Sequence, residues 1–165
     1  EGILNGSTNY ILSRMHGGGC PYGTALKEAQ ELGIAETDPS LDVEGRDTAN
    51  KIVLIANRLF GTAFGPQDIQ VDGITQITAK DVAGAAANGQ VIKLIGIAKQ
   101  RDSGVQLRVA PEWLNRDHPL ASVGGSEKAI SYLTDTMHRI TVSGGKSSPV
   151  GAAAALLKDM INIYH

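Results

Sequence analysis

In the first half of the chain, apolar residues recur at spacings of three and four, a pattern typical of amphipathic helices that bury one face. We predict helices after Ser7 or Thr8, after Thr24, from about Val43 to Phe60, and from Ala79 to Asn88. The hydroxyl of Ser7 or Thr8 is expected to cap the first helix, because it can accept a hydrogen bond from an unpaired amide. Glycine suits the left-handed conformation that ends many helices, and it follows the predicted helices at Gly33, Gly61 and Gly89.

The second half of the chain alternates apolar and polar residues, as half-buried strands do. We expect strands near residues 91–98, 105–109, 129–134 and 137–142. The first two form a hairpin that turns at Asp102-Ser103-Gly104, and a last helix over 151–164 follows Pro149. Helices followed by mostly antiparallel strands predict an α+β fold. We expect one domain over residues 1–165, with a mixed, mostly antiparallel sheet and helices packed on one face.

Composition narrows the class of protein. The chain has 165 residues, of which 42% are hydrophobic and 19% charged, so it is expected to fold around a core of its own. A net charge of -2 argues against a nucleic-acid partner. The sequence has no apolar run of about 18 residues, and its start does not resemble a signal peptide, so no membrane partner is expected. A single cysteine, Cys20, suits the reducing cytoplasm. Because the sequence opens on an apolar stretch without Met, we expect an excised domain.

Acidic residues are concentrated over residues 36–51, where the chain holds Glu36, Asp38, Asp42, Glu44 and Asp47 and then Lys51. At 100° per residue, Glu44, Asp47 and Lys51 form one stripe of the predicted third helix, opposite an apolar side. This apolar side is expected to contain Ala49, Ile52, Ala56, Leu59 and Phe60. The stripe is either a solvated helix face or a lysine held by carboxylates in a cleft, where it could polarise a carbonyl group. Calcium is a weaker alternative, because the acids do not follow the order of an EF-hand loop.

Other motifs do not match known nucleotide sites. Gly145-Lys146-Ser147 lacks the glycine that a phosphate-binding loop needs five positions earlier, where Ile140 stands, and is interpreted as a flexible loop. The glycine-rich segment 17–23 follows a helix and lacks the dinucleotide spacing. The four histidines show no metal-binding spacing. We therefore expect neither a bound metal nor cofactor-binding residues in this chain.

Three segments together resemble the substrate-binding domain of homoserine dehydrogenase. They are Gly-Ile-Leu-Asn-Gly-Ser-Thr-Asn-Tyr-Ile-Leu at 2–12, Ala-Gln-Glu-Leu-Gly-Ile-Ala-Glu-Thr-Asp-Pro at 29–39 and Asp-Val-Glu-Gly-Arg-Asp-Thr-Ala-Asn-Lys at 42–51. The resemblance implies an oxidoreductase of threonine and methionine biosynthesis that interconverts L-aspartate 4-semialdehyde and L-homoserine. It also implies NAD or NADP, bound by a nucleotide-binding domain that the family carries N-terminal to this region. The last helix, about 150–164, is expected to pack on that domain, and the sheet to pair two copies into a homodimer.

The same resemblance assigns roles to particular residues. Lys51 corresponds to the proton donor and Asp47 to an acidic residue that orients the substrate. Glu36 and Asp42 correspond to residues at the amino-acid substrate. Gly6 and Ser7 correspond to the segment that lines the substrate pocket in the family.

The chemistry of the residues agrees with these roles. The substrate is a zwitterion, so its ammonium group needs carboxylates, and a charged lysine can stabilise and protonate a developing alkoxide. The segment 144–151 departs from the family pattern near the cofactor, so the choice between NAD and NADP is left open. The alternative function is a non-catalytic binding or dimerisation module whose acidic loop is structural.

Overall fold

The computed structural model describes residues 1–145 and 149–164, without the side chains of residues 149 and 152. Its centre is a six-stranded sheet in the order β2-β4-β3-β1-β5-β6. The strands are β1 (Gly2–Ile3), β2 (Gln70–Val71), β3 (Gln90–Arg101), β4 (Gly104–Asn115), β5 (Lys128–Leu133) and β6 (Arg139–Gly144). Only the β2–β4 pair is parallel among the described strands, so the prediction of a mixed, mostly antiparallel sheet is confirmed.

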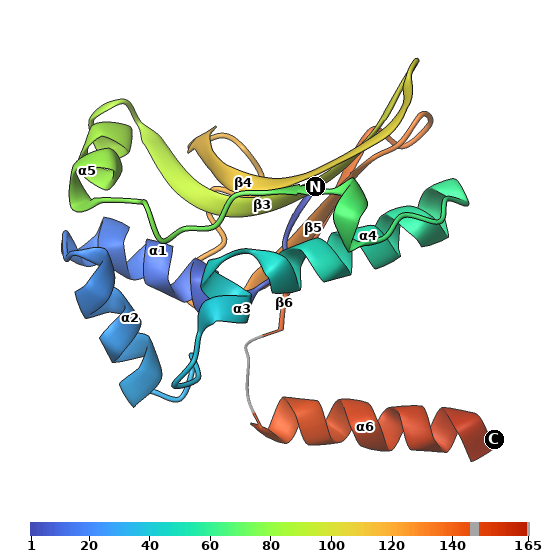
Figure 1. Cartoon of the computed structure of the whole chain (residues 1–165), viewed down its shortest axis with the longest axis horizontal. Helices are drawn as coiled ribbons and strands as arrows, with labels where there is room; N and C mark the ends of the chain where they lie inside the picture. The colour runs from blue at the N-terminus through green and yellow to red at the C-terminus, as the bar shows by residue number, and fades with distance from the viewer. Residues whose placement is uncertain (146–148, 165) are drawn as a thin grey trace.

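Helices cover one face of this sheet, which confirms the predicted α+β fold (Figure 1). They are α1 (Gly6–Gly18), α2 (Tyr22–Glu31), α3 (Ser40–Val43), α4 (Arg46–Phe60) and α5 (Ala79–Ala87), with a 3-10 turn, η1, at Pro66–Asp68. A further helix, α6 (Pro149–Tyr164), does not join this layer. The predicted left-handed glycines are also confirmed, with φ of 67° at Gly33, 65° at Gly61 and 70° at Gly89.

The predicted cap of the first helix was wrong. Asn5, in an extended conformation with φ −126° and ψ 125°, is the N-cap of α1, and its side chain accepts a hydrogen bond from the Thr8 amide. Ser7 and Thr8 already lie in the first turn, since the helix begins at Gly6. The N-cap thus lies two or three residues earlier than the hydroxyl pattern indicated.

The predicted third helix is broken in two. Gly45, with φ of 85°, separates α3 from α4, so α4 begins at Arg46 rather than Val43. A Cβ atom at this position would lie 3.1 Å from Val71 Cγ1 and 3.3 Å from Val109 Cγ1, so the break is packed tightly against the sheet. Glu44 therefore lies outside the stripe and pairs with Arg46 at 3.0 Å.

The main hydrophobic core lies between the helices and strands β3 and β4. Its fully buried members include Leu12 of α1, Ile52 of α4 and Ile92 of β3. The predicted apolar side of the third helix is buried at Ala49, Ile52 and Ala56. Leu59 and Phe60, on the same side near the end of α4, are 55% and 37% exposed.

Strand β1 was not expected from the sequence, and it determines where the candidate site lies. Gly2 pairs with Gly96 of β3 on one side and Ile130 of β5 on the other, so the start of the chain joins two parts of the sheet. The chain then passes through Leu4 and Asn5 directly into α1. The junction between sheet and helix thus spans two residues.

Helix α6 stands apart from the rest of the molecule in Figure 1. Its apolar side chains are exposed, with Leu156 at 66%, Leu157 at 59% and Met160 at 57%.

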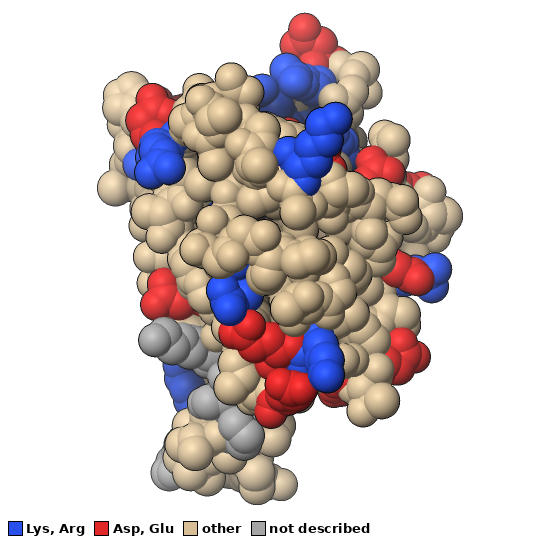
Figure 2. Space-filling model, turned by 90° about the vertical axis from the view of Figure 1, so that its left-hand side faces the viewer, with Lys and Arg blue, Asp and Glu red and all other residues tan. Residues whose placement is uncertain are grey.

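Within the described residues, no helix is long and apolar enough to cross a membrane. The Lys146-Ser147 part of the predicted flexible loop lies outside the described residues. On the face drawn in Figure 2, lysine and arginine are scattered among acidic and uncharged residues rather than gathered in one patch.

Candidate active site

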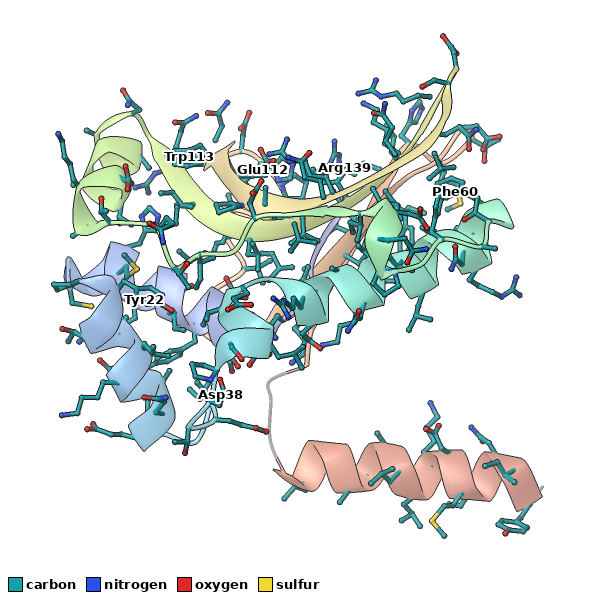
Figure 3. All side chains as sticks on the ribbon, in the orientation of Figure 1. Tyr22, Asp38, Phe60, Glu112, Trp113 and Arg139 are labelled. Carbon is teal, nitrogen blue, oxygen red and sulfur yellow. The ribbon has the colours of Figure 1, made fainter. Side chains whose placement is uncertain are left out.

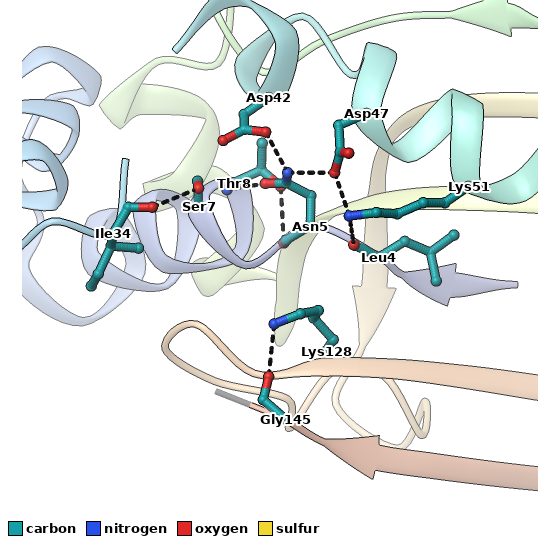
Figure 4. Close-up of polar contacts among 10 residues, drawn as sticks. All are labelled: Leu4, Asn5, Ser7, Thr8, Ile34, Asp42, Asp47, Lys51, Lys128 and Gly145. Atoms are coloured by element: carbon teal, nitrogen blue, oxygen red, sulfur yellow. Dashed lines mark hydrogen bonds and ion pairs between the residues drawn. The ribbon is translucent and has the colours of Figure 1, made fainter. Parts of the chain in front are cut away.

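The junction residue Asn5 brings together two of the predicted site carboxylates (Figure 4). Its side-chain amide donates one hydrogen bond of 2.7 Å to Asp42 Oδ1 and another of 2.8 Å to Asp47 Oδ2. Asp42 comes from α3 and Asp47 from the first turn of α4, so the Gly45 break allows both to face Asn5. Of the acidic residues in the segment 36–51, Asp42 and Asp47 thus contact Asn5 at the junction.

Lys51 lies one helical turn after Asp47, and its ammonium group is held from two sides. Its Nζ donates to Asp47 Oδ2 at 2.6 Å and to the Leu4 carbonyl at 3.1 Å. The lysine side chain is 44% exposed, compared with 22% for Asp47. The prediction that spacing of four places these two side chains in contact is confirmed.

The two carboxylates keep acceptor capacity. Within residues 1–145 and 149–164, Oδ2 of Asp42 and Oδ1 of Asp47 accept no hydrogen bond. Ionised carboxylates are acceptors only, so these oxygens can receive a cationic donor such as an ammonium group. Among the described side chains, no group of three or more His, Cys, Asp or Glu is arranged to hold a metal ion.

Gly6 and Ser7 form the buried start of α1 beside Asn5. The Ser7 hydroxyl donates a 2.9 Å hydrogen bond to the Ile34 carbonyl. The serine therefore ties α1 to the segment that leads to the acidic loop, and its proton is not directed at the carboxylates.

Glu36 is not brought into the carboxylate cluster by any contact among the described residues. The residue is exposed, and Gln30 Nε2 donates to its backbone carbonyl at 3.0 Å. The backbone bond fixes the loop, whereas the carboxylate extends from its surface.

Lys128, at the start of β5, is a site residue that the sequence did not reveal. Its Nζ donates to the Gly145 carbonyl at 2.7 Å. Burial, and next the positive charge of Lys51, lower the pKa of Lys128, while the Asp47 carboxylate opposes them. The electrostatic influence of Lys51 and Asp47 indicates that Lys128 lies near them, although 77 positions separate it from Lys51 in the sequence.

Lys51 and Lys128 line one open pocket of about 630 Å³ between α4 and the strands β5 and β6. Its other walls are mostly apolar, with contributions from Ile3, Ile55, Ile130 and Val142, and the glycines Gly144 and Gly145 close one side. The pocket is thus apolar and bordered by two lysines, and Asp47, which holds Lys51, adjoins it.

Comparisons with known proteins identify the family of the chain. The sequence model of the homoserine dehydrogenase family matches residues 1–161. Homoserine dehydrogenase from Methanocaldococcus jannaschii is 44% identical over 165 residues, which is 100% of this chain and 48% of that protein. An NAD(+)-dependent homoserine dehydrogenase from Pseudomonas canavaninivorans is 38% identical, over 99% of this chain and 47% of that protein.

Solved structures give the same result. Homoserine dehydrogenase from S. aureus superposes with a TM-score of 0.91 at 34% identity, over 99% of this chain and 40% of that one. The enzyme from Thiobacillus denitrificans gives 0.92 at 35% identity, over 98% of this chain and 38% of that one. The chain therefore belongs to the homoserine dehydrogenase family, and it spans less than half the length of these relatives.

Proposed function

We propose that this chain is the substrate-binding and catalytic domain of a homoserine dehydrogenase, an oxidoreductase that interconverts L-aspartate 4-semialdehyde and L-homoserine. The observation that carries this proposal is the ammonium group of Lys51, which Asp47 and the Leu4 carbonyl hold at the edge of an apolar pocket. Family membership supports it as well. In the cell, the reaction would serve threonine and methionine biosynthesis, and the lone Cys20 supports a reducing cytoplasm.

Lys51 acts on the aldehyde oxygen of the substrate, which becomes the hydroxyl oxygen of homoserine. When the aldehyde is reduced, negative charge develops on this oxygen, and the lysine ammonium stabilises it and delivers a proton. In the opposite direction, the neutral amine of Lys51 accepts the hydroxyl proton. Asp47 orients the lysine through their 2.6 Å contact, so the ammonium is positioned before the substrate arrives.

The carboxylates bind the other end of the substrate. Asp42 and Asp47 each have an oxygen that accepts no hydrogen bond within the described residues, and together these oxygens suit the substrate ammonium. Glu36 would join them only if its loop moves toward the site on binding, because no contact holds its side chain there among the described residues. Gly6 and Ser7, at the buried start of α1 next to Asn5, would contact the substrate from the side of these carboxylates.

The chain also offers a surface to the hydride carrier. A nicotinamide nucleotide, NAD or NADP, supplies or accepts the hydride when it is bound. Ile55, Val142 and Gly144 line the pocket and would offer the nicotinamide ring an apolar surface, which supports the assignment. We assign the rest of the nucleotide to another part of the enzyme, since the sequence shows no dinucleotide motif. The name of the Pseudomonas relative supports NAD as one of the two carriers.

Two surfaces support the proposed partners. The exposed apolar residues of α6, among them Leu156 and Leu157, suit packing on the nucleotide-binding part of the enzyme. Trp113 is 46% exposed near the end of β4, and Figure 3 marks it beside Glu112 above the layer formed by α1 to α4. This supports a homodimer formed through the sheet, and sedimentation analysis of wild type and Trp113→Ala would test it.

Lys51→Ala tests the catalytic proposal in the enzyme that joins this chain to its nucleotide-binding part. We expect kcat for the oxidation of NAD(P)H by aspartate semialdehyde to fall by about 100-fold or more, the range of general acid–base catalysis. The control is Lys27→Ala, which removes an exposed lysine paired with Glu31 at 3.8 Å and should leave kcat unchanged.

Two outcomes would contradict the proposal. An active enzyme that is indifferent to Lys51→Ala would remove this lysine from the chemistry. An intact wild-type enzyme without activity would favour the non-catalytic binding module. The isolated chain is expected to be inactive in either case, because it lacks a nucleotide-binding motif.

A further inference from the structure

We propose that Asn5 is a positioning residue of this site, whose side-chain amide sets the spacing of Asp42 and Asp47 and, through Asp47, the place of the Lys51 ammonium. The inference rests on the proposed function, because only a reacting site gives this spacing a catalytic consequence. The side-chain amide of Asn5 donates to the two carboxylates, so its effect on the reaction is transmitted by them.

Both amide protons of Asn5 are used. Asn5 Nδ2 donates at 2.7 Å to Asp42 and at 2.8 Å to Asp47, so one nitrogen keeps the two carboxylate oxygens within about 5.5 Å of each other. Carboxylates this close repel one another unless donors stand between them. An amide supplies these donors without adding positive charge, so the pair keeps its negative charge for a substrate ammonium.

The side-chain amide of Asn5 is fixed in its orientation. Asn5 is only 5% exposed, and its Oδ1 accepts hydrogen bonds from the Thr8 amide at 2.9 Å and the Thr8 hydroxyl at 3.1 Å. Rotation of the side chain would therefore break the helix cap and both carboxylate bonds together. The orientation of the donors is set by the start of α1.

The contacts around Lys51 form a closed ring. Asn5 Nδ2 bonds Asp47 Oδ2, the same oxygen accepts from Lys51 Nζ, and Lys51 Nζ donates to the carbonyl of Leu4, the residue bonded to Asn5. The ring joins the first turns of α4 to the end of β1. Removing the amide opens it at one point, and Lys51 is then held less closely against the reacting oxygen.

The test uses two substitutions that keep the helix cap. Serine and aspartate are both good N-cap residues, so Asn5→Ser and Asn5→Asp preserve an acceptor for the Thr8 amide while removing the donated amide. Asn5→Asp also adds a third carboxylate. Thr78→Ala is the matched control, because it removes the side-chain cap of α5, which accepts from the Asp81 amide, and does so outside the site.

All variants are assayed in the enzyme that joins this chain to its nucleotide-binding part. For Asn5→Ser we expect kcat/KM for homoserine to fall by about 100-fold, the effect of a misplacement near 1 Å, while KM for the nucleotide changes less than twofold. For Asn5→Asp, activity relative to wild type should rise as the pH falls from 8 to 6, because a shared proton restores one donor. Asn5→Ser should show no such trend.

Three results would overturn the inference. In the first, the wild type is active and Lys51→Ala is inactive, but the kcat/KM of Asn5→Ser is within about threefold of the wild-type value. The second is a parallel loss of nucleotide affinity with a larger drop in melting temperature than in Thr78→Ala, which would show a purely structural role. The third is an intact wild-type enzyme with no activity, in which case the proposed function fails first and this inference fails with it.

Discussion

Asp47 and Lys51 are joined at 2.6 Å across one turn of α4, and the lysine is the more exposed partner. The acidic residue lies in the first turn, where the helix dipole stabilises negative charge, and the lysine extends back along the helix toward it. The pair is therefore anchored at its acidic end and open at its cationic end, as a proton donor to a bound molecule would need.

Asp47→Asn should separate catalysis from stability. The amide side chain keeps the shape of the aspartate but loses the charge that orients Lys51, so we expect kcat to fall by a factor of about 10–100. The free energy of unfolding should change by less than about 1 kcal/mol, because the pair is partly exposed to solvent. Glu31→Gln is the control, since it alters an exposed pair of the same spacing with Lys27. A kcat equal to wild type would contradict the orienting role.

Asp42 and Glu36 should differ in their effect on substrate affinity. Asp42 is held at the junction by Asn5, whereas Glu36 is exposed on its loop. We therefore expect Asp42→Asn to raise KM for homoserine by about tenfold or more, the usual strength of a hydrogen bond to a charged group. Glu36→Gln should raise it less. Equal or reversed effects, measured by steady-state kinetics, would show that the loop closes onto the substrate.

Gly45→Ala should destabilise the fold more than Gly61→Ala. Both glycines have positive φ, 85° and 65°, so both substitutions strain the backbone by about 1–2 kcal/mol. Only at Gly45 would the new Cβ also lie within 3.4 Å of other side chains, those of Val71 and Val109. Urea unfolding gives the loss of unfolding free energy in each variant. Gly61→Ala reports backbone strain alone, and Gly45→Ala reports backbone strain together with side-chain crowding. Equal losses of unfolding free energy would mean that the valines move aside.

Lys93 should make stability rise in mild alkali. Its side chain is 4% exposed, and its ammonium donates to Asn9 Oδ1 at 2.8 Å and to the Val123 carbonyl at 2.6 Å. Burial lowers the pKa of Lys93 from 10.5 to about 8. Between these values the unfolded chain binds more protons than the folded chain, so the free energy of unfolding increases with pH, by up to about 3 kcal/mol.

The measurement is denaturant unfolding from pH 7 to 10 in wild type and Lys93→Met. The variant should lose most of the increase, whereas Lys80→Met, at an exposed lysine, should keep it. Above pH 10 the trend should reverse, because Tyr10 and Tyr22 have pKa values raised by a hydrogen bond to Glu28 and by burial, respectively. A wild-type profile that is flat between pH 8 and 10 would contradict the prediction.

The sequence predicted those helices and strands in which the spacing of apolar residues is visible within the element itself. Periodicity placed the hairpin of β3 and β4, the pair β5 and β6, and most helix ends, because these features depend on neighbouring residues. It failed at Gly45, where the helical spacing of apolar residues continues across a break. The break is packed against Val71 and Val109, both of which lie far from Gly45 in the sequence. It also failed at β1, because two residues are too short to show alternation.

The candidate site was predictable only in part. Asp47 and Lys51 share one helix, so their spacing alone predicted the contact. Asn5 could have been found as a capping residue, but Ser7 and Thr8 offered the same chemistry two and three positions later. Lys128 gave no local signal, since only the pairing of β5 with β1 brings it to the pocket.

The two-residue strand β1 has a consequence for how the molecule comes apart. In the described sheet it is the sole link between the strands β2, β4 and β3 on one side and β5 and β6 on the other. If Gly2 and Ile3 detach, the sheet divides into two pieces, and Leu4 and Asn5 leave Lys51 and the carboxylates at the same moment. Local opening and loss of the site are thus one cooperative event. A ligand held at Asp42 and Lys51 would slow amide hydrogen exchange at Ile3, even though that residue does not touch the ligand's charged groups.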